Sequence, residues 1–482
     1  MGHHIIDEVK QEKFIFSGKA KLIPILLIVL GAILAGVGAM QVRDNWDNVP
    51  QTEEHVTDAD SHDTHAEEEH GDLHQTVAHA EGEAHAAPHE AAHAEGETHA
   101  VPHEAAHGDH AEITWMTRVW ANLLMNSYYF WLFAVGALFF IAVNYVANAG
   151  WAVMLKRIME AQTAYLFVGS IILFLVIYFG ADFNYHHWIP YFDSEIAGNT
   201  KSPDFDAILE SKHWLLNKGA IFGFVPFVLI VWYGVRFKLR KNSVAEDQTK
   251  GLSMFKNSTR WSAFFIFFFA FSFSALSWLI IMSIDAHWYS TMFSVYNFAI
   301  AFVTSLSVMM LILQYLKSKG YMEMVSDDVV HDLGKFMFAF CIFWGYIFLS
   351  QWLLIWYTNL PEETVYFDAR LTGQFKPLFF INLFMCFLAP FLVLMMRGAK
   401  RNTLVLLTAA AVILVGHWVD MYLLIMPGTV GVKAGIGMLE IGTTMAFAGI
   451  FSFTVLYSLS RANLYPVNHP YILESANHDV GP

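Results

Sequence analysis

The sequence contains little cysteine and little charge, and both shortages restrict what the protein can be. Only two of its 482 residues are cysteines and 15% are charged, whereas 56% are hydrophobic and the mean hydropathy is +0.42. Cys341 and Cys386 both fall within long apolar stretches. Nothing here resembles a disulfide framework, a CxxCH haem attachment or a cysteine-ligated cluster, and we interpret both thiols as buried and inert. The low charge excludes a large water-soluble fold.

Several motifs of nucleotide and metal enzymes are also missing. The chain has no Gly-rich nucleotide loop, no Walker lysine and no zinc-type His-Glu helix motif. A haem b held by two histidines needs both on facing helices at matched depth, and His417 is the only histidine well inside an apolar stretch. We therefore expect the chain to bind no redox cofactor of its own and no nucleic acid.

Long hydrophobic stretches occupy most of the chain. A membrane-spanning helix needs roughly 20 apolar residues, and about ten stretches reach that length. This predicts an all-α integral membrane protein in contact with lipids. The predicted spans cover residues 20–40, 128–147, 163–182, 219–237, 261–282, 293–315, 334–356, 378–396, 404–425 and 437–459.

The distribution of Lys and Arg predicts the orientation. If the N-terminus is cytoplasmic, 20 of the 28 basic residues lie in cytoplasmic segments and 8 lie on the opposite side. By the positive-inside rule we expect both termini to be cytoplasmic. The first stretch loosely resembles a signal peptide, but its full spanning length favours a retained helix.

These spans divide the chain into five predicted parts. Residues 128–282 and residues 293–425 each hold four spans, and one span flanks them at each end. Residues 1–48 hold the N-terminal segment and first helix, and residues 437–482 hold the last helix and a cytoplasmic tail. Residues 49–127 form an acidic, His-rich periplasmic loop, which we expect to be disordered in part.

The loop carries a tandem repeat of fourteen residues, AEGEAHAAPHEAAH at 80–93 followed by AEGETHAVPHEAAH at 94–107. Imidazoles and carboxylates alternate between His55 and His110, which would suit weak binding of divalent metals or protons. A tolerated expansion of a polar loop explains the same composition.

Ionisable residues inside spans are rare and indicate function by default. His417 and Asp420 lie three residues apart in the ninth span, so they share one helix face. They suit a proton path that opens outward, although a His–Asp hydrogen bond between helices would also be stabilising. The other carboxylates and imidazoles lie near helix ends, where solvation alone can explain them. The candidates for a proton path are His417, Asp420, Glu440, Asp182, Asp285 and His287.

Two short motifs carry a resemblance to a known family. The stretch 285–293, DAHWYSTMF, resembles the W-x-S-T-x-F motif of polysulfide-reductase-like (NrfD-like) membrane subunits. The stretch 417–422, HWVDMY, is similar to the W-x-E-R-[FY] motif late in that family. The resemblance also implies two four-helix bundles, at 128–282 and 293–425, flanked by one helix at each end, as in the larger ten-helix members of the family. The chain is most similar to the second NrfD-like component of bacterial alternative complex III, a quinol:electron-acceptor oxidoreductase. The resemblance covers nearly all spans but not the His-rich loop.

The resemblance implies a role and partners. It implies a subunit of the bacterial inner membrane that supports a quinol-binding sister subunit and conducts protons, beside a multihaem c-type cytochrome and iron–sulfur subunits. Haem c and iron–sulfur clusters would then belong to the partners. Where the quinol-binding sister has a Glu-Arg pair, this chain has Asp420 and Met421, so the basic partner is missing.

Two alternatives stay open. The chain itself could bind quinol in one bundle, with a histidine and a carboxylate as proton acceptors, and His186 and His187 are the candidates. It could instead be a secondary transporter built from repeats, which would show interrupted helices in paired positions. Pro226 and Pro390 lie in the third helix of each predicted bundle and provide such a signal.

Overall fold

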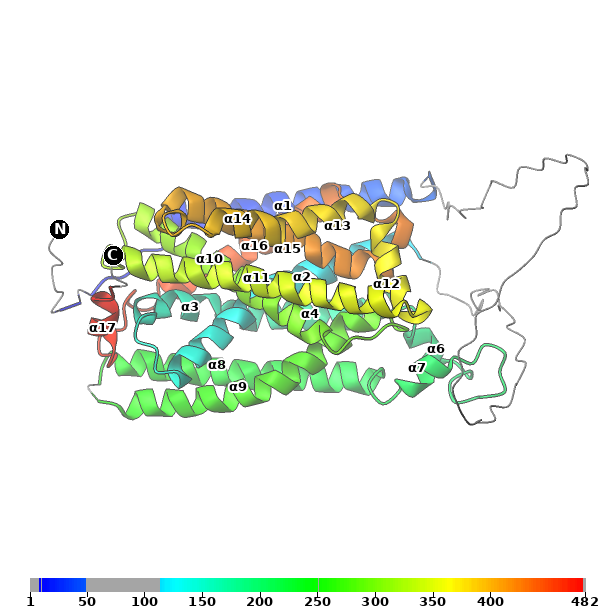
Figure 1. Cartoon of the computed structure of the whole chain (residues 1–482), viewed down its shortest axis with the longest axis horizontal. Helices are drawn as coiled ribbons and strands as arrows, with labels where there is room; N and C mark the ends of the chain where they lie inside the picture. Colours follow the sequence, from blue (N-terminus) through cyan, green and yellow to red (C-terminus); the bar gives the residue numbers. More distant parts are fainter. Residues whose placement is uncertain (1–7, 10, 49–112, 250, 480–482) are drawn as a thin grey trace, which may run out of the picture. The chain divides into compact units, whose positions relative to one another are not determined.

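The described residues form an all-α protein in this computed structural model, which describes residues 8–9, 11–48, 113–249 and 251–479 (Figure 1). Ten helical segments within these ranges are long and apolar enough to cross a membrane. This confirms the predicted number of spans, and the protein is a multi-pass membrane protein. The His-rich stretch between His55 and His110, with its repeat, lies outside the described residues.

Seven spans are essentially single helices and three are composite. The third span joins α3 to α4, the fourth begins with a π-helix before α8, and the eighth consists of α13, a π-helix and α14. The helices of the spans are α1 (Gly18–Asp44), α2 (Trp115–Val146), α3 (Lys156–Gln162), α4 (Tyr165–Phe179), α8 (Val225–Glu246), α9 (Ser253–Ile280), α10 (Phe293–Ser318), α11 (Asp327–Thr358), α13 (Phe375–Leu383), α14 (Ala389–Leu394), α15 (Thr403–Thr429) and α16 (Met438–Leu459).

Helix contacts define two four-helix bundles, as predicted. In the first, α2, α4, α8 and α9 pack together, and in the second α10, α11, α13–α14 and α15 do so. The two bundles meet mainly where α2 packs along α10. These two helices are the most buried spans, because each is covered by its own bundle and by the other.

The first and last spans form a separate pair, α1 against α16, which packs on the first bundle through α2. Glycines allow close contact between the two backbones, since small residues are what membrane helices use to approach one another. A Cβ atom at Gly31 would lie 2.4 Å from the backbone N of Ala446, and one at Gly442 would lie 2.3 Å from the N of Ala35.

Both bundles interrupt their third helix in the same way. A π-helix at Ala220–Phe224 precedes α8, and another at Phe384–Leu388 precedes α14. In each case a proline, Pro226 or Pro390, is the second residue of the α-helix that follows. Proline has no N–H to donate, and the wider turn accommodates the missing hydrogen bond.

The second span begins earlier than the hydrophobic pattern predicts. The helix starts at Trp115, so the predicted loop 49–127 and the first bundle's start at 128 are wrong by about thirteen residues. The polar residues Asn122 and Asn126 lower the hydropathy there, yet both are completely buried against α16. This part of the helix is stabilised by hydrogen bonds to the neighbouring helix, and its sequence therefore lacks the apolar pattern that identified the other spans.

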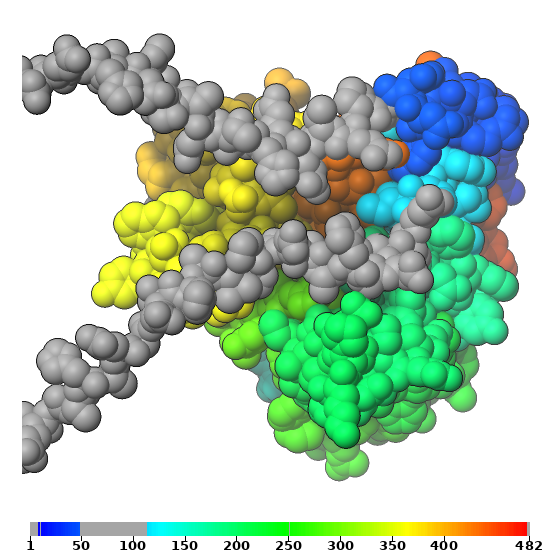
Figure 2. Space-filling view, turned by 90° about the vertical axis from the view of Figure 1, so that its right-hand side faces the viewer, coloured from blue at the N-terminus to red at the C-terminus, as the bar shows by residue number. Residues whose placement is uncertain are grey.

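The two ends of the spans differ. At one end the N-terminal segment meets the residues after α16, and we call this the terminal end. There the Leu464 backbone N–H donates to the carbonyl of Glu12 at 2.7 Å. A short helix, α17 (Ile472–Ala476), follows. The opposite end carries α5 (Ala181–Asn184), α6 (Ile189–Asp193), α7 (Ala207–Ser211) and α12 (Pro361–Leu371), and we call it the α12 end. Figure 2 shows the α12 end, with α6 and α7 in green and α12 in yellow.

Candidate functional site

A buried carboxylate lies at the centre of the second bundle. Asp420 is 1% exposed and lies on α15, nine residues before the helix ends at Thr429. At 1.5 Å per residue this places it about 13 Å along the helix from the α12 end. An ionisable group at such a depth needs polar partners, because the surrounding side chains and lipid cannot solvate it.

Each of the other three helices of the bundle supplies a donor to Asp420. The hydroxyl of Tyr296, from α10, donates to Oδ1. The indole of Trp344, from α11, donates to Oδ2 at 3.1 Å, and the amide of Asn382, from α13, donates to Oδ1 at 3.0 Å. Three hydrogen bonds from three helices therefore hold the carboxylate in a fixed position where water is scarce.

His417 extends this group, as its spacing predicts. Its Nδ1 lies 3.2 Å from Oδ2 of Asp420 and 3.5 Å from the sulfur of Cys386. Its Nε2 is buried and has no hydrogen-bond partner among the described residues. An imidazole that donates from Nδ1 to a carboxylate keeps Nε2 as a proton acceptor. His417 can therefore take a proton at Nε2 and pass one from Nδ1 to Asp420.

Cys386 is closer to this chemistry than its sequence context suggests. It lies in the π-helix between α13 and α14, and its thiol donates to the amide oxygen of Asn382 at 2.9 Å. Gly416 allows the approach, because a Cβ there would lie 2.8 Å from the sulfur. One donor atom each from Cys386, His417 and Asp420 lies within 4.8 Å of the others, so these residues could hold a metal ion.

A second charged group lies between Asp420 and the α12 end. Arg370, from α12, is 3% exposed and donates to the carbonyl of Leu423 at 2.9 Å, one turn beyond Asp420. The same guanidinium donates to Asp285 at 2.8 Å and lies 3.4 Å from the ring centre of Tyr366. A buried basic residue is thus present near Asp420, although Met421 is apolar. Arg370 lies on α12, outside the 417–422 motif that resembles the family.

Asp285 and His187 meet at the end of α15. Asp285 lies against Gly428, where a Cβ would be 2.7 Å from its carboxylate. The ring nitrogen Nε2 of His187 lies 3.1 Å from the carbonyl of Gly428. The ring of His186 lies beside that of His187 at a tilt, with ring centres 4.1 Å apart, and its Nδ1 lies 3.0 Å from the carbonyl of Phe183. Three sequence candidates therefore gather at one helix end.

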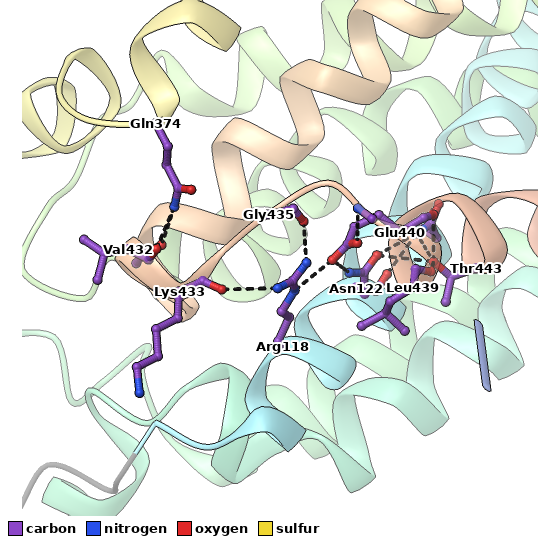
Figure 3. Close-up of polar contacts among 12 residues, drawn as sticks. Arg118, Asn122, Gln374, Val432, Lys433, Gly435, Leu439, Glu440 and Thr443 are labelled. Carbon is purple, nitrogen blue, oxygen red and sulfur yellow. Dashed lines mark hydrogen bonds and ion pairs between the residues drawn. The ribbon is translucent and has the colours of Figure 1, made fainter. Parts of the chain in front are cut away.

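Glu440 belongs to a different group, between α2 and α16 (Figure 3). It is completely buried and accepts from Arg118 at 2.9 Å and Asn122 at 2.8 Å, while the backbone N–H of Gly437 donates to its other oxygen at 2.7 Å. These bonds tie the carboxylate to an arginine. A cavity of about 190 Å³ lies beside the pair and is lined partly by Trp46.

Hydrogen bonds lead from Glu440 toward α15. Asn122 accepts from Thr443 at 3.2 Å, and Asn126 donates to Thr443 at 3.2 Å. Asn126 also accepts from Thr444 at 2.8 Å, and Thr444 accepts from the indole of Trp418 at 2.8 Å. The chain of bonds ends at the residue next to His417. The groups around Glu440 and Asp420 are therefore neighbours, although their carboxylates do not share a donor.

The remaining candidates lie at the periphery. Asp182 is exposed, as expected for a residue near a helix end. His287 is also exposed and pairs with Asp206 at 2.5 Å, at the start of α7. Burial alone would raise the pKa of Asp206, but His287 and the backbone N–H groups of α7 lower it below its usual value. Neither Asp182 nor His287 takes part in the Asp420 group.

Sequence reasoning missed a buried ionic cluster at the terminal end. Arg157 is 2% exposed and pairs with Glu160 at 2.9 Å and Asp247 at 2.5 Å, and Arg240 also reaches Glu160. The backbone N–H of Val467 donates to Asp247 at 3.1 Å, which ties the C-terminal segment to the cluster. The sequence signal was Glu160, an acidic residue that follows Lys156 and Arg157 just before the predicted third span.

Compared with known proteins, the chain matches no family model, and no curated protein matches it.

Proposed function

We propose that this chain is a membrane component of a respiratory quinol:electron-acceptor oxidoreductase, supporting a quinol-oxidising sister subunit and conducting protons. The proposal joins the resemblance to the second NrfD-like component of alternative complex III with the hydrogen-bonded carboxylate in the second bundle. Its partners would be that sister subunit, a multihaem c-type cytochrome and iron–sulfur proteins in a bacterial inner membrane. Both termini would face the cytoplasm.

The observation that carries the proposal is the Asp420 group. Quinol oxidation releases protons, and a chain that conducts them needs acceptors held at fixed distances in a dry region. His417 directs Nδ1 at Asp420, and its Nε2 is buried without a hydrogen-bond partner among the described residues, so a proton could be received there. Asp420 is bonded to Tyr296, and the ion pair of Arg370 with Asp285 lies between Asp420 and the α12 end. In the proposed orientation this end is periplasmic.

Direct binding of quinol by this chain is supported less well. The ring nitrogens of His186 and His187 described above lie against the backbone carbonyls of Phe183 and Gly428. Such contacts orient the rings and hold the α12 end together. We therefore assign quinol oxidation to the sister subunit and proton conduction to this chain.

The first test is purification of the chain from native membranes in mild detergent, with mass spectrometry and a reduced-minus-oxidised spectrum. Co-purifying c-type haem and iron–sulfur subunits are the expected result. A colourless single-chain protein would reject the proposal. That result would favour a secondary transporter, which the paired π-helices before Pro226 and Pro390 support because transporters interrupt matching helices of their repeats.

The second test addresses Asp420 within the purified complex. Asp420→Asn keeps the size of the side chain and removes its ability to accept a proton, so proton-coupled turnover should fall by about 100-fold. The exposed Asp182→Asn is the matched control and should leave turnover unchanged. Haem content and subunit composition show whether each variant assembles. Wild-type turnover and proton release in an assembled Asp420→Asn complex would contradict the relay.

A further inference from the structure

We propose that Cys386, His417 and Asp420 form a binding site for a borderline-soft divalent metal ion of the zinc type. The site goes beyond the proposed function, since it adds Cys386 to His417 and Asp420 and makes these side chains a place for an ion rather than a proton. Thiolate, imidazole and carboxylate are the three side-chain types that ligate Zn²⁺.

The distances fit one ion. Zinc binds sulfur at about 2.3 Å, nitrogen at about 2.0–2.1 Å and oxygen at about 2.0–2.2 Å, so tetrahedral ligands lie about 3.6 Å apart for N and S and about 3.4 Å apart for N and O. The structure has 3.5 Å between His417 Nδ1 and Cys386 Sγ, and 3.2 Å between Nδ1 and Asp420 Oδ2. Both separations from His417 are therefore close to those of a tetrahedral ion, and Cys386 and Asp420 place their donor atoms within 4.8 Å of each other.

The surroundings orient these ligands. Trp344 donates to Oδ2 of Asp420 while Tyr296 and Asn382 donate to Oδ1, which fixes the plane of the carboxylate. Hydrogen-bonded carboxylates of this kind are usual around metal sites. The amide oxygen of Asn382, 2.9 Å from the sulfur, is a candidate for the fourth ligand.

Two further observations support an ion at this position. The π-helix at Phe384–Leu388 carries Cys386, and Gly416 leaves room for its sulfur against α15. π-helical turns often occur at functional sites. At the corresponding place in the first bundle, four residues before Pro226, the residue is Phe222, so only the second bundle has a thiol there.

Charge also favours the ion. A divalent cation bound by one thiolate and one carboxylate makes a neutral unit, which an apolar environment accepts far more readily than an isolated charge. Binding would release the thiol proton and the Nδ1 proton, or shift the latter to Nε2. An ion and a relayed proton cannot occupy these atoms together, so metal binding would block the proposed relay.

Cobalt tests the site without reference to redox activity. The full chain would be produced in cells supplied with Co²⁺, so that the ion is present while the helices assemble, and then purified in mild detergent. A thiolate ligand gives cobalt a near-ultraviolet charge-transfer band that histidine and carboxylate do not give. Since the only cysteines are Cys341 and Cys386, the His-rich loop cannot produce this band.

We expect the wild-type protein to show the band and the visible absorption of tetrahedral cobalt. Cys386→Ser should abolish the band, and His417→Gln should weaken Co²⁺ binding at least about tenfold. Cys341→Ser, which removes the buried thiol of α11, is the matched control and should keep the band. Absence of the band in the wild-type protein would overturn the proposal, as would its persistence in Cys386→Ser or its loss in Cys341→Ser.

Discussion

The packing of α1 on α16 makes the clearest prediction, because two glycines of α1 differ only in what surrounds them. At Gly31 an added Cβ would meet backbone atoms of the partner helix at 2.4, 2.7 and 2.9 Å. Ordinary contacts begin near 3.4 Å. Backbone atoms cannot rotate away, so Gly31→Ala must push the two helices apart locally by about 1 Å. A gap of that size forfeits a quarter to a half of each dispersion contact.

Overpacking of this kind costs about 1–3 kcal/mol. Gly36 is the matched control, since a Cβ there meets nothing within 4 Å and alanine forms helices better than glycine. We expect Gly31→Ala to lower the free energy of unfolding by about 1–3 kcal/mol and Gly36→Ala to leave it unchanged or raise it. Thermal unfolding in mild detergent, followed by tryptophan fluorescence, measures both. Equal stability of the two variants would refute the reasoning.

Two other predictions concern charge. Arg118→Ala should destabilise the protein by about 3–5 kcal/mol, because it leaves Glu440 buried without its cation. Arg43→Ala breaks an exposed pair with Asp44 and should cost less than about 1 kcal/mol. Chemical denaturation measures the free energy of unfolding of both variants. Similar decreases for Arg118→Ala and Arg43→Ala would contradict the burial of the Arg118–Glu440 pair. Burial, reinforced by nearby Lys156, lowers the pKa of His469 from 6.5 to about 2. The unfolded chain thus binds an extra proton between these values, and stability should fall as the pH decreases below about 6.5. His469→Phe should reduce this fall, and an unchanged pH profile of unfolding would contradict it.

The number of spans could be predicted because a bilayer accepts only stretches long and apolar enough to cross it. Hydropathy alone therefore identified ten segments, whereas their grouping into two bundles was implied by the family resemblance. It failed at Trp115–Ser127, where buried asparagines satisfy one another and α16 rather than lipid. A hydropathy window cannot distinguish a polar residue facing water from one facing a hydrogen-bond partner.

The candidate site was predictable only in part. His417 and Asp420 are three residues apart, and the helical repeat alone brings them together. Tyr296, Trp344 and Cys386 come from three other helices, and no local pattern in the sequence relates them to Asp420. Arg370 was missed for the same reason, since it lies on α12, outside the spans.

The sequence by itself determined the membrane-spanning architecture, the helix face shared by His417 and Asp420, and the paired prolines of the third helices. These features depend on length, apolarity and helical period, which act over neighbouring residues. Tertiary structure alone decided that Glu440 is tied to Arg118, that Asp420 receives donors from the three other helices of its bundle, and that Cys386 lies beside His417. Such contacts join residues far apart in the chain, and only the packing of helices brings them within hydrogen-bond distance.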